Sequence, residues 1–227
     1  MALAHSPRIV TDGLVLCLDA GNTKSYPGSG TTWTDLSGNG NNGSLENGLT
    51  YSSLNGGSLN FDGTNQYVDL GTSTDFNLPG DFSLDAWIQL DTTKDNVIFN
   101  IGDHAGSSGI VFYAFNNSNN ALSVVTNSAV AFSSGTVPLT TWTHTALVRS
   151  GSTNTLYING TSIGTFTNSA TFSGSGNAYL GVNYLNGTFG TGYFDGKISS
   201  ARLYKGKALT AAEIQQNFNA LRGRFGI

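Results

Sequence analysis

Cysteine is almost absent from this sequence, which excludes one common source of stability. Cys17 is the single cysteine among 227 residues, so no disulfide can form within the chain. The fold must therefore rely on a hydrophobic core that is large enough to be stable by itself. Because Cys17 lies in the apolar run Leu14–Leu18, we interpret it as a buried structural thiol.

Carboxylates that could act in pairs are also scarce. Glu46 and Glu213 are the two glutamates, and the aspartates lie mainly in turns such as Asp62-Gly63. Retaining hydrolysis of a glycosidic bond needs two carboxyl groups about 5 Å apart. No Glu-x-Asp-x-Glu string occurs, and the three histidines show neither metal-binding spacing nor the context of a catalytic triad. We therefore expect a protein that is not an enzyme, with a glycoside hydrolase as the least favoured function.

Long apolar segments are missing as well. No run of about 18 apolar residues occurs, and residues 1–10 lack the apolar region of a secretory signal. We therefore expect neither a membrane span nor a signal peptide.

Charge is sparse and unevenly placed. Charged residues make up 11% of the chain, and six of the ten Lys and Arg residues follow position 196, where Glu213 is the one acidic residue. A basic C-terminal segment on an otherwise acidic protein favours docking to an acidic partner. The alternative is that these charges lie on a helix and a tail that contact only solvent. The candidate docking residues are Lys205, Lys207, Arg222 and Arg224. They are too few for nucleic acid binding.

Turn-forming residues, in contrast, are abundant. Thirty glycines, with many Asn, Ser and Thr, separate short apolar runs along the whole sequence. This pattern is typical of an all-β protein with tight connections, and no linker divides it. We predict about a dozen strands in two packed antiparallel sheets.

Alternating patterns define the clearest strands. In residues 82–88, Phe82 and every second residue after it form a core face, with Asp85 and Trp87 on the opposite face. Residues 142–148 place Trp142 and His144 on one face, and we interpret His144 as a hydrogen-bonded core histidine. The other expected strands are residues 14–19, which we place centrally, 58–62, 67–71, 97–101, 110–115, 122–126, 155–161 and 178–182.

Two local signals specify connections. Asn159-Gly160 is a strong hairpin-turn signal, and an Asp-Gly pair lies between the strands at 58–62 and 67–71. Near the end, residues 193–204 form a turn and a closing strand. Thr210 then precedes Glu213 by three residues, the spacing of a helix capping box.

Several strings follow one another in a specific order. They are Leu59-Asn60-Phe61-Asp62-Gly63, Tyr67-Val68-Asp69-Leu70-Gly71, Phe82-Ser83-Leu84-Asp85-Ala86-Trp87, Trp142-Thr143-His144, Leu156-Tyr157-Ile158-Asn159-Gly160 and residues 194–214. As an ordered set they resemble the concanavalin A-like lectin/glucanase superfamily, in its laminin-G-like branch. The resemblance implies a two-sheet antiparallel jelly-roll sandwich with one short C-terminal helix, in which residues 14–19 pair with residues 197–204.

This resemblance also implies a domain organisation. An N-terminal arm (1–13) precedes a single sandwich domain (14–221), and a C-terminal tail follows (222–227). The arm and the tail would then be attachment points outside the sandwich.

Members of this family often hold structural calcium, and oxygen ligands that suit Ca²⁺ are present. The implied pairing of the end strands would bring Asp19 near Asp195, with Asn39 or Asn41 contributed by the Gly- and Asn-rich loop of residues 22–48. Ser199-Ser200 stands where relatives often carry two aspartates. Ordinary Asp-Gly turns are the alternative role for these acids.

Sugar recognition needs an exposed aromatic ring beside hydrogen-bonding groups. The candidate ligand-binding residues are Asp85, Trp87, Tyr113, Tyr157, Asn183 and Tyr184. For each aromatic the alternative is packing under a loop or the helix.

Composition and resemblance together suggest a biological setting. Low charge with many Asn, Ser, Thr and Gly residues is similar to laminin-G-like structural proteins of tailed bacteriophages. We expect a non-catalytic structural or adhesion protein on a virion, as a decoration, fibre or tail component that binds host glycans. Its partners would be glycans, other virion proteins bound through the termini, and further copies of itself in a homo-oligomer. The alternative is a free-standing bacterial lectin found outside the cell.

Overall fold

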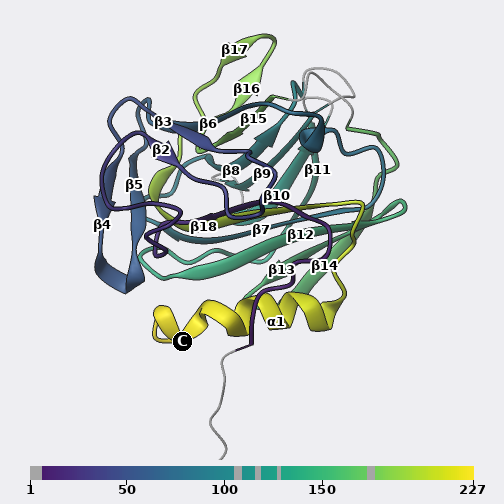
Figure 1. Ribbon diagram of the computed structural model, residues 1–227. Helices are drawn as coiled ribbons and strands as arrows, with labels where there is room; N and C mark the ends of the chain where they lie inside the picture. The colour runs from purple at the N-terminus through teal and green to yellow at the C-terminus, as the bar shows by residue number, and fades with distance from the viewer. Residues whose placement is uncertain (1–6, 105–108, 116–118, 127–128, 173–176) are drawn as a thin grey trace, which may run out of the picture.

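The computed structural model describes residues 7–104, 109–115, 119–126, 129–172 and 177–227, so residues 1–6 of the expected arm lie outside it. Two large antiparallel sheets pack face to face, and one helix near the C-terminus lies along one of them (Figure 1). The prediction of an all-β sandwich with a short C-terminal helix is confirmed.

Sheet A contains the first and last strands. Its order is β14-β13-β12-β7-β18-β5-β4, and β1 also pairs with β18. The strands are β1 (Leu14–Asp19), β4 (Thr50–Ser52), β5 (Ser58–Asp62), β7 (Phe82–Leu90), β12 (Thr143–Ser150), β13 (Thr153–Ile158), β14 (Thr161–Thr167) and β18 (Asp195–Lys205).

Sheet B forms the second layer, in the order β11-β10-β9-β8-β15-β6-β3-β2. Its strands are β2 (Thr32–Trp33), β3 (Gly43–Glu46), β6 (Tyr67–Thr72), β8 (Asn96–Ile101), β9 (Ile110–Phe115), β10 (Ala121–Thr126), β11 (Ala129–Ser134) and β15 (Asn177–Leu180). A separate hairpin joins β16 (Tyr184–Leu185) to β17 (Thr188–Phe189). The helical segments are η1 (Leu54–Gly56), η2 (Thr74–Phe76), α1 (Ala211–Leu221) and η4 (Arg222–Arg224).

The predicted pairing of the end strands is confirmed, with Asp19 of β1 opposite Ser200 of β18. However, β1 is not central, because β18 is the one strand with which it pairs among the described residues. A loop covers its other edge: the Cys17 amide donates to Asp35 Oδ1 at 2.8 Å, and the Leu36 amide donates to the Cys17 carbonyl oxygen. Cys17 is buried as predicted, and burial raises the pKa of its thiol to about 11.

The strands on either side of Asp62-Gly63 belong to different sheets. β5 pairs with β18 in sheet A, whereas β6 pairs with β3 and β15 in sheet B. The turn therefore carries the chain from one layer to the other. In contrast, Asn159 (φ 49°) and Gly160 (φ 79°) connect β13 directly to β14, as the hairpin signal predicts.

The core lies between the two sheets. On β7 the predicted core residues Phe82, Leu84, Ala86 and Ile88 are fully buried there. The opposite face of β7 is buried too, because α1 lies across the outer side of sheet A (Figure 1). A second layer on this sheet therefore hides most of the outer face of the strand from water as well.

The predicted capping box opens α1. The Glu213 amide donates to Thr210 Oγ1 at 3.2 Å, and the Thr210 amide donates to Glu213 Oε2 at 2.8 Å. Among the described residues, none of the helices combines the length and the apolar character needed to cross a lipid bilayer.

Both expected attachment segments pack on the sandwich. In the tail, Phe225 is 7% exposed and stacks on Trp87. In the arm, Val10 is buried, and its amide donates to Asn217 Oδ1 of α1 at 2.8 Å. Thus the described part of the arm and the tail belong to the folded domain and do not lie outside it, in contrast to the sequence interpretation.

Candidate functional site

The helix and the tail cover the middle of the outer face of sheet A. Trp87 is fully buried beneath two rings, with centroid distances of 5.6 Å to Phe218 and 4.3 Å to Phe225. Tyr157 is 7% exposed and packs in a cluster with Ile214 of α1. The interpretation of Trp87 and Tyr157 as an exposed sugar-binding surface is therefore wrong, because the helix and the tail cover this face.

Asp85 lies in the same covered layer and is fully buried. Its carboxylate accepts hydrogen bonds from Arg202 Nε at 2.5 Å and from Asn217 Nδ2 at 2.8 Å. Burial alone would raise the pKa of Asp85, but the Arg202 charge, the nearby His144 side chain and the hydrogen bond from Arg202 together outweigh burial and hold that pKa below its ordinary value. Asp85 therefore fastens α1 to the sheet and is not available to a ligand.

His144 is buried beside this pair, as predicted for a core histidine. Its Nε2 lies 3.7 Å from Asp85 Oδ1, beyond hydrogen-bonding distance, and neither ring nitrogen has a hydrogen-bond partner among the described residues. The side-chain hydrogen bond expected for His144 is therefore absent among the described residues. Burial lowers the pKa of His144, so the ring is neutral at pH 7.

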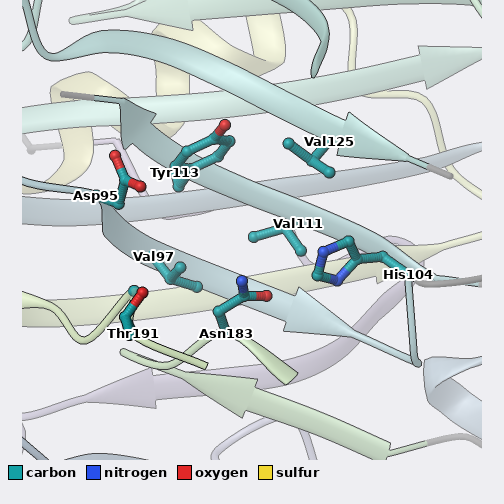
Figure 2. A pocket seen from close by; sticks show the side chains of 9 residues that line it. Asp95, Val97, His104, Val111, Tyr113, Val125, Asn183 and Thr191 are labelled. Carbon is teal, nitrogen blue, oxygen red and sulfur yellow. The ribbon is translucent and has the colours of Figure 1, made fainter. Parts of the chain in front are cut away.

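Sheet B carries a hollow on its outer face. The cavity is about 100 Å³ and is lined by side chains from β8, β9 and β10 and from the segments that flank them (Figure 2). The lining residues are Asp95, Val97, His104, Val111, Tyr113, Val125, Asn183, Thr191 and Gly192. Tyr113 and Asn183, two of the residues expected from the sequence, meet here.

The hollow has an apolar floor and a polar rim. Val97, Val111 and Val125 lie between Asp95 at one end and His104 at the other (Figure 2). The two best-buried floor residues, Val97 and Val111, are 2% and 3% exposed. This arrangement suits a small molecule that is apolar on one side and polar at its edge.

The titratable groups of the rim are mostly uncharged at pH 7. Burial lowers the pKa of His104, whose Nδ1 lies 3.1 Å from the Tyr184 carbonyl oxygen and so donates to it when the ring is neutral. Burial, assisted by the Asp95 charge, raises the pKa of Tyr113. Asn183 Oδ1 is buried without a hydrogen-bond partner among the described residues. A ligand in the hollow can use this acceptor once the Asn183 side chain turns toward it.

An aromatic cluster adjoins the hollow, formed by Tyr67, Tyr179, Tyr184 and Phe189. Phe189 lies 4.7 Å from Tyr67, 5.3 Å from Tyr179 and 5.5 Å from Tyr184, measured between ring centroids. Phe189 is 40% exposed and Tyr179 is buried, so the cluster presents one open ring on a packed base. Tyr184, the third sequence candidate that lies in this region, belongs to the cluster.

The β16–β17 hairpin carries Tyr184 and Phe189, and Asp103 holds its turn. The Asp103 carboxylate accepts hydrogen bonds from the Asn186 amide at 3.1 Å and from the Gly187 amide at 3.0 Å. Sequence reasoning missed Asp103, His104, Tyr67 and Phe189, because they come from separate strand ends. The Asn186-Gly187 pair is the one signal that could have revealed this hairpin.

The four candidate metal ligands do not fit one calcium ion. Asp19 Oδ1 and Oδ2 accept hydrogen bonds from Arg224 at 2.6 and 3.0 Å. Asp195 lies opposite Asp62, five residues from the Asp19 partner Ser200 and roughly 16 Å away along the strand. Asn41 Nδ2 donates to Asp75, and Asn39 Nδ2 donates to Ser37. The described residues contain no group of three or more His, Cys, Asp or Glu side chains that could hold a metal.

The basic docking residues are largely engaged within the protein. Lys207 Nζ lies 2.9 Å from Glu213 and 3.2 Å from Asp12, and Arg224 pairs with Asp19. Lys205 Nζ donates to the Thr74 carbonyl oxygen at 2.5 Å. Arg222 is exposed, with its guanidinium 5.9 Å from the Phe218 ring centroid. Arg222 is therefore the most accessible of the four charges.

Comparison with known proteins places this architecture in a family. A sequence profile described as "Concanavalin A-like lectin/glucanases superfamily" matches residues 62–215. Comparison with curated proteins found no match.

Solved structures with the same fold include a sugar-bound one. Domain 4 of AbnA, a GH43 extracellular arabinanase from Geobacillus stearothermophilus solved with arabinotriose, is 20% identical with a TM-score of 0.66, and the alignment covers 90% of this chain and 97% of that one. A Trypanosoma rangeli sialidase mutant that displays trans-sialidase activity is 17% identical with a TM-score of 0.71. That alignment covers 96% of this chain, which spans about a third (34%) of the sialidase.

A third similar structure is the binding domain of Paraclostridial Mosquitocidal Protein 1, which is 14% identical with a TM-score of 0.63. The alignment covers 92% of this chain and 52% of that one. At these identities the likeness shows the shared fold.

Proposed function

The chain belongs to the concanavalin A-like lectin/glucanase superfamily, and we propose that it is a non-catalytic carbohydrate-binding protein whose ligand lies on the outer face of sheet B. One observation carries this proposal. The middle of the outer face of sheet A is covered by α1 and the tail, whereas sheet B presents a hollow beside a partly exposed aromatic cluster.

The chemistry of this face suits a sugar. A sugar ring has apolar C–H groups on its faces and hydroxyls around its edge, so it can contact Phe189 while its hydroxyls bond to polar groups. Thr191 and Asn183 both line the hollow, and the Asn183 side chain carries an amide oxygen without a hydrogen-bond partner among the described residues. The arabinotriose bound to the similar arabinanase domain supports the same class of ligand.

The composition of the hollow supports binding without catalysis. Asp95 is the one carboxylate among its lining residues, all of which belong to the described part of the chain. Retaining glycoside hydrolysis requires two carboxyl groups about 5 Å apart. Turnover of aryl glycosides that disappears in Asp95→Asn would overturn the non-catalytic proposal.

A glycan array with the purified protein tests the binding function. We expect binding to at least one neutral glycan, and a loss of about tenfold or more in affinity for Phe189→Ala, because that ring supplies the open aromatic surface. Leu54→Ala is the matched control, since Leu54 is also apolar and is 74% exposed but lies in η1. An array without bound glycans, or equal losses in both variants, contradicts the proposal.

For the biological setting, we propose display on a virion, with a bacterial lectin outside the cell as the alternative. The composition described above supports the virion setting, and exposed Arg222 offers a contact for an acidic virion protein. Mass spectrometry of purified particles should detect the protein, and Arg222→Glu should reduce its incorporation. Presence in the culture medium without particles favours the lectin.

A further inference from the structure

We infer that the hollow on sheet B is a subsite for the acetamido group of an N-acetylated amino sugar. The inference rests on the proposed carbohydrate-binding function and names the sugar class. Two features of the hollow carry it: a floor of three valines and an unpaired buried acceptor in the wall.

The valine floor is unusual for the outer face of an antiparallel sheet, where side chains commonly alternate from an apolar core to polar groups facing water. Val97 lies opposite Tyr113 in the β8–β9 ladder, and Val111 lies opposite Val125 in the β9–β10 ladder. Together they form an apolar cluster that is separate from the main core. The floor is therefore built from three adjacent strands and can receive an apolar group.

A methyl group suits this floor better than a hydroxyl. The floor side chains are hydrocarbon, so a hydroxyl placed against them would lose its bonds to water and find no new partner. A methyl group has no such bonds to lose and gains apolar contact. One group of this size in an apolar pocket typically changes affinity by about 10- to 200-fold.

The unpaired acceptor in the wall indicates which second group the ligand carries beside its methyl group. Asn183 Oδ1 is buried and has no hydrogen-bond partner among the described residues, so an N–H group of a ligand would satisfy it once the Asn183 side chain turns toward the hollow. Asn183 and Val111 line the same small cavity (Figure 2). An acetamido group contains both an N–H donor and a methyl group, and its carbonyl oxygen can accept from the Thr191 hydroxyl at the rim.

Matched sugars separate the two contributions. Isothermal titration compares the methyl glycosides of N-acetylglucosamine, N-formylglucosamine and glucose, with the N-acetylgalactosamine glycoside as a second acetamido probe. We expect an N-acetyl sugar to bind about tenfold or more tightly than the N-formyl sugar, which lacks the methyl group, and than glucose, which lacks the amide. Equal binding of the three gluco sugars overturns the inference. L-fucose and L-galactose serve as a further pair, since they differ by a methyl group without an amide. A preference for L-fucose over L-galactose that exceeds the preference for N-acetyl over N-formyl sugar also overturns the inference.

Two variants test the floor and the acceptor. Val111→Thr keeps the shape of the side chain and introduces a hydroxyl, so it should remove the preference for N-acetyl over N-formyl. Asn183→Leu should reduce N-acetyl sugar binding about tenfold or more. Val130→Thr is the control, because Val130 lies on β11 and is 45% exposed. If Val111→Thr does not fold, Val125→Thr, at a half-buried floor position, replaces it.

These outcomes separate the two levels of the proposal. Binding of other glycans that Phe189→Ala weakens, without any preference for acetamido sugars, overturns this inference and leaves the proposed function standing. A glycan array without any bound sugar overturns both. Retention of the N-acetyl preference in Val111→Thr overturns the role of the valine floor.

Discussion

Phe225 stacks on Trp87, with ring centroids 4.3 Å apart and ring planes 25° apart. This contact joins the last residues of the chain to the middle of β7. Phe225 also lies 4.6 Å from Trp142, so its ring fills the space between two tryptophans. The C-terminal segment is thus part of the packing that covers the middle of the outer face of sheet A.

Removal of this ring should destabilise the protein. We expect Phe225→Ala to lower the free energy of unfolding by about 3 kcal/mol, because it leaves a cavity against Trp87. Ile227→Ala is the control, since Ile227 is 44% exposed, and it should change stability by less than about 0.5 kcal/mol. Urea denaturation followed by tryptophan fluorescence measures both. Equal stability of the two variants would show that the tail does not pack in solution.

The buried pair of Asp85 and Arg202 predicts a second effect on stability. Arg202→Met should cost about 3–5 kcal/mol, because it leaves the Asp85 carboxylate buried without its charged partner. Lys197→Met breaks the exposed Lys197–Asp91 pair and should cost less than about 1 kcal/mol. The double variant Arg202→Met with Asp85→Leu should recover part of the loss. No recovery would mean that the packing of Arg202 matters more than its charge.

Acidification should destabilise the protein through its buried histidines. Burial lowers the folded-state pKa of His144 and of His104, whereas unfolded histidine titrates near pH ~6.5. Below pH ~6.5 the unfolded state binds more protons than the folded state. The stability that comes from neutral buried histidines is therefore fully present above this pH and is lost as the pH falls.

The expected slope is about 1.4 kcal/mol per pH unit for each histidine that stays neutral in the folded state. His144→Gln should flatten the curve between about pH 6.5 and 5, and His104→Gln should do so separately. Urea titrations at several pH values measure this. Identical slopes in the wild type and in both variants would contradict the prediction.

Removal of calcium should leave the thermal midpoint unchanged. Arg224 already compensates the Asp19 carboxylate, and the other three candidate ligands lie with different partners. A calcium ion at a free concentration of 100 times its dissociation constant would raise the free energy of unfolding by about 2.7 kcal/mol. Calorimetry with EGTA and with added CaCl₂ makes the comparison. A lower midpoint in EGTA would reveal a calcium site elsewhere in the chain.

The turn of the β16–β17 hairpin should control ligand affinity. Asp103→Ala removes the acceptor of two turn amides, so the hairpin that carries Phe189 loses its position. We expect a several-fold loss of glycan affinity and a cost in stability of about 1 kcal/mol. Asp62→Ala is the matched control, because Asp62 Oδ1 accepts a hydrogen bond from the Thr64 amide in another turn. Unchanged affinity in Asp103→Ala would separate the hairpin from binding.

Much of the fold was predictable from local patterns, because alternation, turn pairs and capping depend on neighbouring residues. The β7 alternation identified the core face correctly, and Thr210 and Glu213 predicted the start of α1. The polar face of β7 misled the interpretation of Asp85 and Trp87. A strand pattern alone does not reveal that a helix more than a hundred residues later covers the second face.

The candidate site was less predictable for a related reason. Tyr113 and Asn183 are seventy residues apart, and they meet because β8 pairs with both β9 and β15. The valines of the floor resemble ordinary strand residues in the sequence. The outward direction of Val97 depends on a register shift in β8 between Val97 and Phe99, which no local pattern signals.

The position of α1 has a consequence for tethered copies. The C-terminal helix lies on the outer side of sheet A, whereas the β16–β17 hairpin stands beyond sheet B, on the opposite side of the molecule (Figure 1). If Ile227 is linked to a particle or a solid surface, the hollow therefore points away from that surface. Many copies held in this way face outward together, so weak single-site binding can gain about 10²- to 10⁴-fold in avidity on a glycan-coated surface.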